Sequence, residues 1–481
     1  EVLGVLKHTN TGRDLIMVRV GGGPITSRQT GIMSGMSGSP VYVSGKLLGA
    51  VAYGLPYAKE PVGMVTPIED MLEAWDSNLP KHATGYSSAQ SLPSPISVDG
   101  KSVDKVQIDA PGSTRRSVEG DTMYMQPLMT TLMCTGISQK GIDRLADILR
   151  PFGIKPMAGP GGSDSKAKVK VDLQPGSAVG MSLASGDVDM TGIGTVTYRR
   201  GNRIVAFGHP MLSIGAVDAP MTTAYIVDVL SNFQNSIKIG TSMQTVGRIF
   251  QDRPWSIAGA LGAAPKTIPV TIAVDDQSSR RDRVFHVNVI NHPLLASRLI
   301  AMVTSEAIAD LHSTPGDATA MVSYDVVADQ IGKISRSNVF FDRASLEISA
   351  TTDVAQLLSL LSTNKFEPLD IRSVNLKVKI LPKRDTATID RIFVKKSEFE
   401  PGEMVDVGVV LRPYKQPRVT KTFQIKIPAT AADGKIGLVV RGGGTPAGLQ
   451  VMAGASPDMA GDSPESDMMP GGPMMGGDPG M

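Results

Sequence analysis

The sequence predicts a mainly β protein of several domains, and three observations lead to this class. Short runs of aliphatic and β-branched residues recur along the chain, each bounded by turn-forming residues. Glycine and proline are frequent, with 51 Gly and 33 Pro, whereas aromatic residues make up only 5% of the chain. A chain of 481 residues is too long to fold around a single hydrophobic core, so we expect roughly three or four domains.

Residues 1–80 are expected to form the first domain, made of short strands and one helix. The run from 67 to 75 begins with a proline and carries acidic residues in its first turn, both typical of a helix N-terminus. Turns that contain glycine separate the β-rich runs before it. These predicted strands cover residues 2–6, 15–20, 40–43 and 46–51.

Residues 81–167 are expected to form a linker with a helical insert. The stretch 81–120 is rich in Ser, Pro, Gly and Asp, which predicts a surface excursion. Apolar residues at helical spacing predict a helix over 138–150, with Ser138 as its N-cap. The run GPGGSDSK at 159–166 then predicts a flexible joint.

The β pattern returns at residue 168 and defines a second β domain over 168–285. Its predicted strands cover residues 169–173, 194–198, 203–207 and 269–274. A further strand at 284–290 crosses the boundary to the next part of the chain.

Three regions are expected after residue 285. Helices predicted at 293–311 and 353–361, among strands, make residues 286–383 an α+β module. An alternating strand pattern over residues 389–442, broken at 400–403 and 432–434, predicts an Ig-like β-sandwich over 384–442. Residues 443–481 are dominated by Gly, Pro, Asp and Met, which predicts a disordered tail.

Composition excludes several classes of function. Lys and Arg total 48 and Asp and Glu 46, so no net field favours nucleic acid. The single cysteine, Cys134, excludes an internal disulfide framework and a Cys-based zinc site. No apolar run approaches the ~18 residues of a membrane span. Because the chain begins at Glu1, we expect a processed or truncated product whose signal segment or anchor has been removed.

The most informative motif is GMSGSP at residues 35–40, where Ser37 stands between two glycines just before a predicted strand. Flanking glycines adopt turn conformations closed to other residues and allow a substrate carbonyl to approach closely. The N–H groups of Gly35 and Ser37 can then point at one spot, as an oxyanion hole requires, with the serine oxygen beside it. For this motif alone, the alternative is a glycine-rich hairpin with an incidental serine.

A serine nucleophile needs a base, and His209 is the candidate among the chain's six histidines. It follows a predicted buried strand in the turn FGHP, where Gly208 allows a sharp exit and Pro210 sets the chain direction. Such a turn presents an imidazole at the end of a strand with little rotational freedom. The alternative is a histidine that only caps a turn.

Two stretches of the chain resemble the sporulation stage IV B (SpoIVB-type) family of serine peptidases. TGIMSGMSGSPV at 30–41, followed by GKLLGAV at 45–51, is similar to the region that carries this family's nucleophile. GIGTVTY at 192–198, with AFGH at 206–209, resembles the segment that carries its catalytic histidine.

A third block resembles a motif that follows the histidine in the same family. It consists of GRI at 247–249 and RPWSIAGALG at 253–262. The resemblance covers residues 1–75 and 168–285, about two-fifths of the chain.

The resemblance implies a trypsin-like double β-barrel peptidase with its active site between the barrels. It makes Ser37 the nucleophile and His209 the general base, with the N–H groups of Gly35 and Ser37 as the oxyanion hole. Residues 1–80 would then hold the serine half-barrel and 168–285 the histidine half-barrel. This order is the reverse of the family's, so the expected fold is circularly permuted, which is physically acceptable because each barrel closes its own hydrogen bonds.

The acid of the triad is not identified by the resemblance. In the family it lies shortly upstream of the serine, but residues 21–29 read GGGPITSRQ and contain no carboxylate. Candidates are Asp14 and Asp218, or else Asp187 or Asp189. The alternatives are a Ser–His dyad and a silent site. Loss of the acid from a trypsin triad slows catalysis by about 10⁴-fold without abolishing it.

We therefore expect a serine endopeptidase of SpoIVB type, from the bacterial envelope, periplasm or secreted fraction. Its substrate would be a peptide or protein, with self-processing included, and the C-terminal β modules would bind an envelope partner. No metal, small-molecule cofactor or nucleic acid is expected. The alternative function is a catalytically weak or silent barrel protein that serves as an envelope scaffold or binding module.

Overall fold

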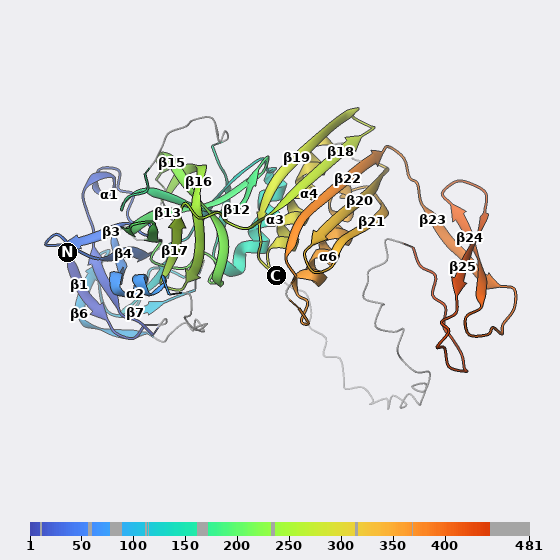
Figure 1. The fold of residues 1–481 in the computed structure, drawn as a ribbon. Helices are drawn as coiled ribbons and strands as arrows, with labels where there is room; N and C mark the ends of the chain where they lie inside the picture. The colour runs from blue at the N-terminus through green and yellow to red at the C-terminus, as the bar shows by residue number, and fades with distance from the viewer. Residues whose placement is uncertain are drawn as a thin grey trace, which may run out of the picture. The chain divides into compact units, whose positions relative to one another are not determined.

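The computed structural model describes residues 1–9, 12–55, 60–76, 89–110, 113, 115–160, 172–231, 236–312, 316–367 and 369–442. The chain divides into two compact units, Glu1–Asp385 and Thr386–Met481. Strands dominate the described part, which confirms the mainly β class (Figure 1).

The first sheet of unit 1 carries the serine motif. Its strands follow the order β1-β2-β5-β4-β9-β7-β6, with β3 paired to β4 and β8 paired to β9. The predicted strands of the first domain are present, and its predicted helix is α2. The elements are β1 (Val2–Leu6), β2 (Leu15–Arg19), α1 (Gly23–Ser27), β3 (Pro40–Val43), β4 (Lys46–Gly54), β5 (Val62–Pro67), α2 (Ile68–Glu73), β6 (Gln90–Val98), β7 (Lys101–Ile108), β8 (Val118–Glu119) and β9 (Thr122–Pro127).

Strands β6 to β9 differ from the linker expected for this part of the chain. β6 is the outermost strand of the sheet and contains Pro93 and Pro95, which is why its sequence reads as a surface stretch. Prolines are tolerated at an edge because one side of that strand needs no ladder hydrogen bonds. β7 and β9 lie further in, and their residues Val103, Val106 and Met123 are in the buried core of this sheet.

The second sheet contains a barrel-like ring of six antiparallel strands that carries His209. Pairings run β12-β13-β14-β17-β16-β15 and return from β15 to β12. β10 continues from β13 and β11 from β10. The elements are β10 (Thr131–Thr135), α3 (Gln139–Leu149), η1 (Arg150–Phe152), β11 (Lys155–Ala158), β12 (Ala178–Gly186), β13 (Asp189–Arg200), β14 (Arg203–Ala206), β15 (Gly215–Leu230), β16 (Ile237–Arg253) and β17 (Ser256–Leu261).

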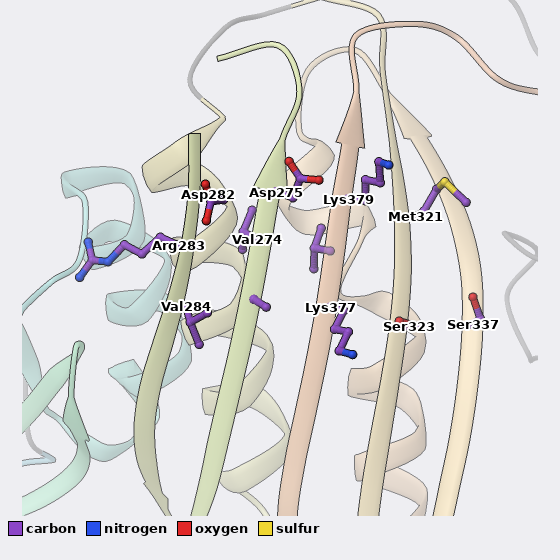
Figure 2. Close-up of a pocket in the computed structure, with 12 residues that line it drawn as sticks. Val274, Asp275, Asp282, Arg283, Val284, Met321, Ser323, Ser337, Lys377 and Lys379 are labelled. Carbon is purple, nitrogen blue, oxygen red and sulfur yellow. The ribbon is translucent and has the colours of Figure 1, made fainter. Parts of the chain in front are cut away.

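Five further strands extend this sheet from β12 in the order β19-β18-β22-β20-β21. The predicted domain boundary at 285/286 falls inside β19. The open face of these strands forms a groove of about 450 Å³, lined among others by Val284, Met321, Lys377 and Lys379 (Figure 2). The elements are β18 (Thr267–Asp276), β19 (Arg281–Ile290), α4 (Ala296–Leu311), β20 (Ala318–Ala328), β21 (Gly332–Asp342), α5 (Leu346–Ser349), α6 (Thr352–Ser362) and β22 (Ile371–Leu381).

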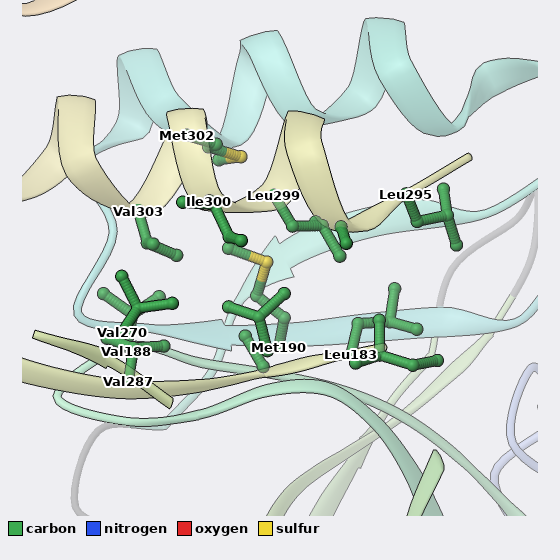
Figure 3. Close-up of a cluster of buried hydrophobic side chains, with 14 of the residues drawn as sticks. Leu183, Val188, Met190, Val270, Val287, Leu295, Leu299, Ile300, Met302 and Val303 are labelled. Atoms are coloured by element: carbon green, nitrogen blue, oxygen red, sulfur yellow. The ribbon is translucent and has the colours of Figure 1, made fainter. Parts of the chain in front are cut away.

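The other face of these strands holds the largest core of the chain. Along β18 the residues Ile268, Val270 and Ile272 are buried, and they belong to one cluster with Leu299 and Val303 of α4. Figure 3 shows this helix lying over the strands, with Leu299, Ile300 and Val303 directed at them. The predicted helices at 293–311 and 353–361 are thus confirmed as α4 and α6.

Helix α3 confirms the helix predicted over 138–150 and its cap. The Ser138 hydroxyl accepts from Gly141 N–H at 3.0 Å, which satisfies one of the free N–H groups of the first turn. The predicted joint at 159–166 and the strand at 169–173 lie largely outside the described residues. No helix in the described part of the chain has the length and hydropathy to cross a membrane.

The two sheets of unit 1 pack together through a small buried cluster. Met71 and Trp75, from α2 and the residues after it, contact Val205 of β14 and Ala258 of β17. Trp75 also donates through Nε1 to the Ile204 carbonyl at 3.0 Å. This contact fixes the first sheet against the barrel-like ring.

Unit 2 is an antiparallel sheet in its described part. Its strands are β23 (Ala387–Val394), β24 (Met404–Pro413) and β25 (Val419–Lys426), in that order. Val405, Val407 and Val409 form its small core. A sandwich needs a second packed sheet, which the described residues of this unit do not form, so the Ig-like sandwich stays a prediction. The tail predicted at 443–481 lies outside the described residues.

Candidate active site

Ser37 lies in the loop between α1 and β3, here called the serine segment (residues 30–39). Gly35 and Gly38 in this segment have φ angles of +89° and +92°, in the left-handed region that favours glycine. A side chain at Gly38 is also excluded sterically, because its Cβ would stand 2.0 Å from the Thr195 carbonyl oxygen and 2.5 Å from the Phe207 nitrogen. The serine motif therefore places its backbone directly against the sheet that carries the histidine.

The serine segment runs beside the start of β16. Ser34 forms a parallel bridge with Ile237. Its N–H donates to the Ser236 carbonyl at 2.8 Å, and its carbonyl accepts from Lys238 N–H at 3.1 Å. The Ser236 hydroxyl donates to the Thr30 carbonyl at 2.7 Å. A loop of the first sheet thus pairs with the second sheet through a single isolated bridge.

Strand β13 holds the other side of the serine segment. Thr195 N–H donates to the Ser37 carbonyl at 2.9 Å, and the Thr195 hydroxyl donates to the Gly35 carbonyl at 3.0 Å. The Thr197 hydroxyl donates to the Gly38 carbonyl at 2.7 Å. The carbonyls of Gly35, Ser37 and Gly38 are thus satisfied by the second sheet, so the local conformation of the motif depends on the contact between sheets.

The N–H groups of Gly35 and Ser37 are left open by these contacts. Neither donates a hydrogen bond to any residue that the structure describes. The carbonyls in the same two peptides, those of Ser34 and Met36, accept main-chain hydrogen bonds at 3.1 and 2.8 Å. Because a trans peptide is planar with its C=O and N–H opposed, each held carbonyl fixes the direction of the neighbouring N–H. An oxyanion hole needs such unoccupied, pre-oriented donors.

Lys238 lies over the same glycine. Its Cβ comes within 3.1 Å of the position a Gly35 side chain would take, and its Nζ donates to the Gly35 carbonyl at 3.2 Å. Burial lowers the pKa of Lys238. The Lys238 amine, whose charged form burial disfavours, therefore lies next to the candidate oxyanion hole.

His209 follows β14 in what is here called the histidine turn (residues 207–214). Phe207 and Gly208 both have positive φ angles, +69° and +72°, which reverse the chain. The Gly208 carbonyl accepts from the Thr66 hydroxyl at 2.7 Å. A Cβ at Gly208 would meet those of Ala52 and Ala50 at 3.1 and 3.2 Å, so the turn lies closely on β4.

The imidazole of His209 has a defined tautomer. Its Nδ1 lies 2.7 Å from the Pro210 carbonyl oxygen, which only accepts, so Nδ1 carries the proton and donates. Nε2 is then the unprotonated nitrogen, and it is buried without a hydrogen-bond partner among the described residues. Burial lowers the pKa of His209 to about 4, so the ring is neutral at physiological pH and Nε2 is free to accept a proton.

The structure brings the serine segment and the histidine turn into contact at Gly38 and Phe207. Among the residues that the structure describes, no hydrogen bond joins the side chains of Ser37 and His209, and His209 Nε2 has no partner. Ser37 and His209 are each only 1% exposed. A substrate carbonyl therefore reaches Ser37 only after the groups that cover it move.

Asp14 and Asp218 do not touch the imidazole in this structure. Asp14 accepts from Lys7 Nζ at 2.5 Å and from His8 N–H at 3.1 Å. Asp218 accepts from Arg248 Nη1 at 3.2 Å and from a main-chain N–H at 3.0 Å. Both carboxylates are held by other partners, while His209 Nδ1 donates to a main-chain carbonyl.

The other two sequence candidates are also engaged elsewhere. Asp187 accepts from Arg283 Nη2 and from His286 N–H. Asp189 accepts from the hydroxyls of Thr191 and Ser242, both at 2.8 Å. Neither carboxylate lies within hydrogen-bond distance of His209.

A further acid next to the histidine turn is missed by the sequence reasoning. Asp252, near the end of β16, is fully buried and accepts from the N–H groups of Met211 and Leu212 at 2.8 and 2.7 Å. It stands between the two parts of the third family-like block, just before Arg253. Its place inside this block was the sequence signal that could have identified Asp252. The sequence does not show, however, that its hydrogen-bond donors are Met211 and Leu212, about forty residues earlier in the chain.

Together these groups can perform acyl transfer chemistry. A hydroxyl, an unprotonated imidazole nitrogen and two unoccupied N–H donors lie on segments in direct contact. The described residues contain no cluster of three or more His, Cys, Asp or Glu side chains suited to a metal. Comparison of the chain with models of protein families, with curated proteins and with solved structures finds no match.

Proposed function

We propose that this protein is a serine endopeptidase of SpoIVB type, with Ser37 as nucleophile and His209 as general base. The observation that carries the proposal is the pair of open N–H groups at Gly35 and Ser37, oriented by peptides whose carbonyls are already held. A glycine-rich hairpin with an incidental serine has no need to leave these two donors unused.

The reaction would follow the acyl-enzyme route. Ser37 Oγ attacks a peptide carbonyl carbon while its proton passes to His209 Nε2, and the oxyanion accepts from the two open N–H groups. The imidazolium then gives that proton to the leaving amine as the C–N bond breaks. Water, deprotonated by Nε2, attacks the ester carbon, and the acid product leaves as Ser37 regains its proton.

The proposal includes the permuted trypsin-like arrangement. The barrel-like ring of the second sheet carries His209, and the loop that holds Ser37 belongs to the first sheet, which supports a site built between two β layers. The substrate would be a peptide or protein, self-processing included. Location in the bacterial envelope or outside the cell, and an envelope partner for unit 2, belong to the same proposal.

A silent barrel protein is the second candidate, because one observation favours it. Ser37 and His209 are nearly inaccessible, and Nε2 makes no hydrogen bond in this structure. A scaffold would keep both residues only for packing. Under that function, no reagent would modify Ser37 in the folded protein.

Labelling with a fluorophosphonate separates the two functions. We expect a covalent adduct on Ser37, found by peptide mass spectrometry, that is lost in Ser37→Ala and strongly slowed in His209→Ala. Ser39→Ala, two residues further in the same motif, is the matched control and should label like the parent protein. Absence of an adduct in a folded sample, with His209→Ala indistinguishable from the parent, favours the scaffold.

A further inference from the structure

Asp252 is the most deeply buried carboxylate near the candidate site. It has no exposed surface and lies next to the end of β16. It accepts hydrogen bonds from the N–H groups of Met211 and Leu212 at 2.8 and 2.7 Å. The N–H groups of Ser213 and Ile214 also favour its charged form and so act to lower its pKa. A charge buried this deeply is stable only when hydrogen bonds satisfy it, and here main-chain donors of the histidine turn do so.

One peptide unit connects this carboxylate to the imidazole. The carbonyl of Pro210 accepts from His209 Nδ1 at 2.7 Å. The N–H of Met211 belongs to the same peptide and donates to Asp252 at 2.8 Å. The resulting chain of hydrogen bonds runs from the imidazole through the peptide to the carboxylate. As in a direct imidazole–carboxylate pair, the imidazole N–H is the donor at one end and the carboxylate is the acceptor at the other.

We propose that Asp252 is the third member of the site, a positioning residue that acts on His209 through the Pro210–Met211 peptide. This inference rests on the proposed function, since it gives the missing acid of that site a location. Asp14 and Asp218 then have no part in orienting the ring.

Two physical effects make this relay work. The peptide is planar, so a bond that holds its N–H also fixes the direction in which its carbonyl receives the Nδ1 proton. A negative charge at the N–H also polarises the peptide and makes the carbonyl a better acceptor, because hydrogen bonds in a chain reinforce one another. Both effects keep the proton on Nδ1, leave Nε2 as the base, and favour the imidazolium that forms during reaction.

The alternative is that Asp252 only closes the turn structurally. Its charged neighbour is Arg253, whose pKa is lowered by burial, while the charges of Asp252 and Asp76 act in the opposite direction. The main-chain partners of Asp252 on the adjacent strands are Gly215 and Ile257, and the turn residues 211–214 have no titratable side chain. A pH-dependent change in the Met211 or Leu212 amide through this contact therefore reports the ionisation of Asp252 itself.

The isosteric variant Asp252→Asn tests the relay in the full-length protein. It removes the charge and replaces one acceptor by a donor, and we expect fluorophosphonate labelling of Ser37 to slow by about 10- to 100-fold. Asp276→Asn is the matched control, since Asp276 is also buried (1% exposed) but lies on β18. Loss of melting temperature should be similar in the two variants, whereas only Asp252→Asn should lose labelling.

Nuclear magnetic resonance of the His209 ring gives a readout that is independent of activity. With histidine labelled in ¹⁵N, we expect a strongly downfield Nδ1 proton in the parent protein that shifts upfield in Asp252→Asn and is unchanged in Asp276→Asn. In the parent protein the same proton and the Met211 amide should shift together as the pH is lowered from 7 to 5. This pH titration uses only the parent protein, so it tests the relay even when Asp252→Asn does not fold.

The outcomes separate the two proposals. A parent protein that takes no label but shows the coupled His209 and Met211 shifts loses the proposed function and keeps the relay. Normal labelling in Asp252→Asn, with the Nδ1 proton unmoved, overturns the relay and leaves the peptidase intact.

Discussion

The serine segment and the histidine turn meet at the same place but are held there by different forces. Carbonyl groups of the serine segment accept from hydroxyls and main-chain N–H groups of the opposite sheet, those of Thr195 among them. The histidine turn is held largely within its own sheet, by hydrogen bonds from its main-chain N–H groups to the buried Asp252 carboxyl group. The first depends on how the two sheets fit, and the second also depends on the ionisation of Asp252 and His209. Between pH 4 and 6.5 we therefore expect the histidine turn to respond to pH.

The largest effect should come from closing the space between the two segments. Gly38→Ala puts a Cβ 2.0 Å from the Thr195 carbonyl oxygen at a φ of +92°. Left-handed strain and a backbone clash together should lower the free energy of unfolding by about 3 kcal/mol or more, and labelling should be lost. Denaturant unfolding measures the change.

Gly31→Ala is the control for that variant in the same segment. Its φ is +62°, but nothing lies within 4 Å of its Cβ position. Only the backbone strain remains, about 1 to 2 kcal/mol. Equal losses in the two variants would contradict the close contact between the serine segment and the histidine turn.

The pH dependence of unfolding should reveal two opposed contributions in the histidine turn. Burial raises the pKa of Asp252 from 3.8 to about 6, so its contribution to the free energy of unfolding falls as pH rises through that window. Burial lowers the pKa of His209 from 6.5 to about 4, so its contribution rises with pH from 4 to 6.5. Each amounts to about 3 kcal/mol, and in the parent protein they largely cancel.

Single variants uncover each contribution. Between pH 4 and 6, we expect stability to rise with pH in Asp252→Asn and to fall with pH in His209→Ala, relative to the parent protein. Urea unfolding at several pH values measures both slopes. If both variants keep the parent's pH profile, neither group titrates as its burial requires.

A smaller effect is expected when one inter-sheet hydroxyl is removed. Thr195→Val keeps the shape of the side chain but removes the donor to the Gly35 carbonyl, which keeps its bond from Lys238. We expect a loss of about 1 to 2 kcal/mol and slower labelling at every pH. Thr191→Val, on the same strand and bonded to Asp189, is the control and should keep the labelling rate. If the loss of stability or labelling in Thr195→Val depended on pH, the serine segment would not differ from the histidine turn in its response to pH.

The smallest effect on stability should come from Lys238. Lys238→Met keeps the stem that covers Gly35 and removes the bond from Nζ at 3.2 Å. Relief of the buried charge offsets that loss, so the change in stability should stay within about 1 kcal/mol. Labelling should slow several-fold if the cation supports the oxyanion. Lys266→Met, with a side chain 62% exposed, is the control.

Local signals identified much of the fold in advance. The strands around the serine motif, helix α3 with its Ser138 cap, and helices α4 and α6 were all predicted from periodicity and capping residues. β6 was not, because an edge strand that contains prolines has the composition of a loop. β7 was missed as well, because it lies in the same Ser-, Pro-, Gly- and Asp-rich stretch. The second sheet of a sandwich in unit 2 was predicted from alternation alone, and alternation does not specify what a strand packs against.

The sequence by itself determined the two turns of the candidate site, because glycines at left-handed φ and a histidine between Gly and Pro are local features. Only the tertiary structure decided that Thr195, Thr197 and Lys238 hold the serine segment, and that Asp252 reaches the histidine turn through a peptide. The reason is physical. The residues of a turn determine its φ angles locally, whereas a main-chain carbonyl or N–H forms a hydrogen bond with any suitable partner that comes close. Which partner arrives depends on how the strands of the two sheets are arranged.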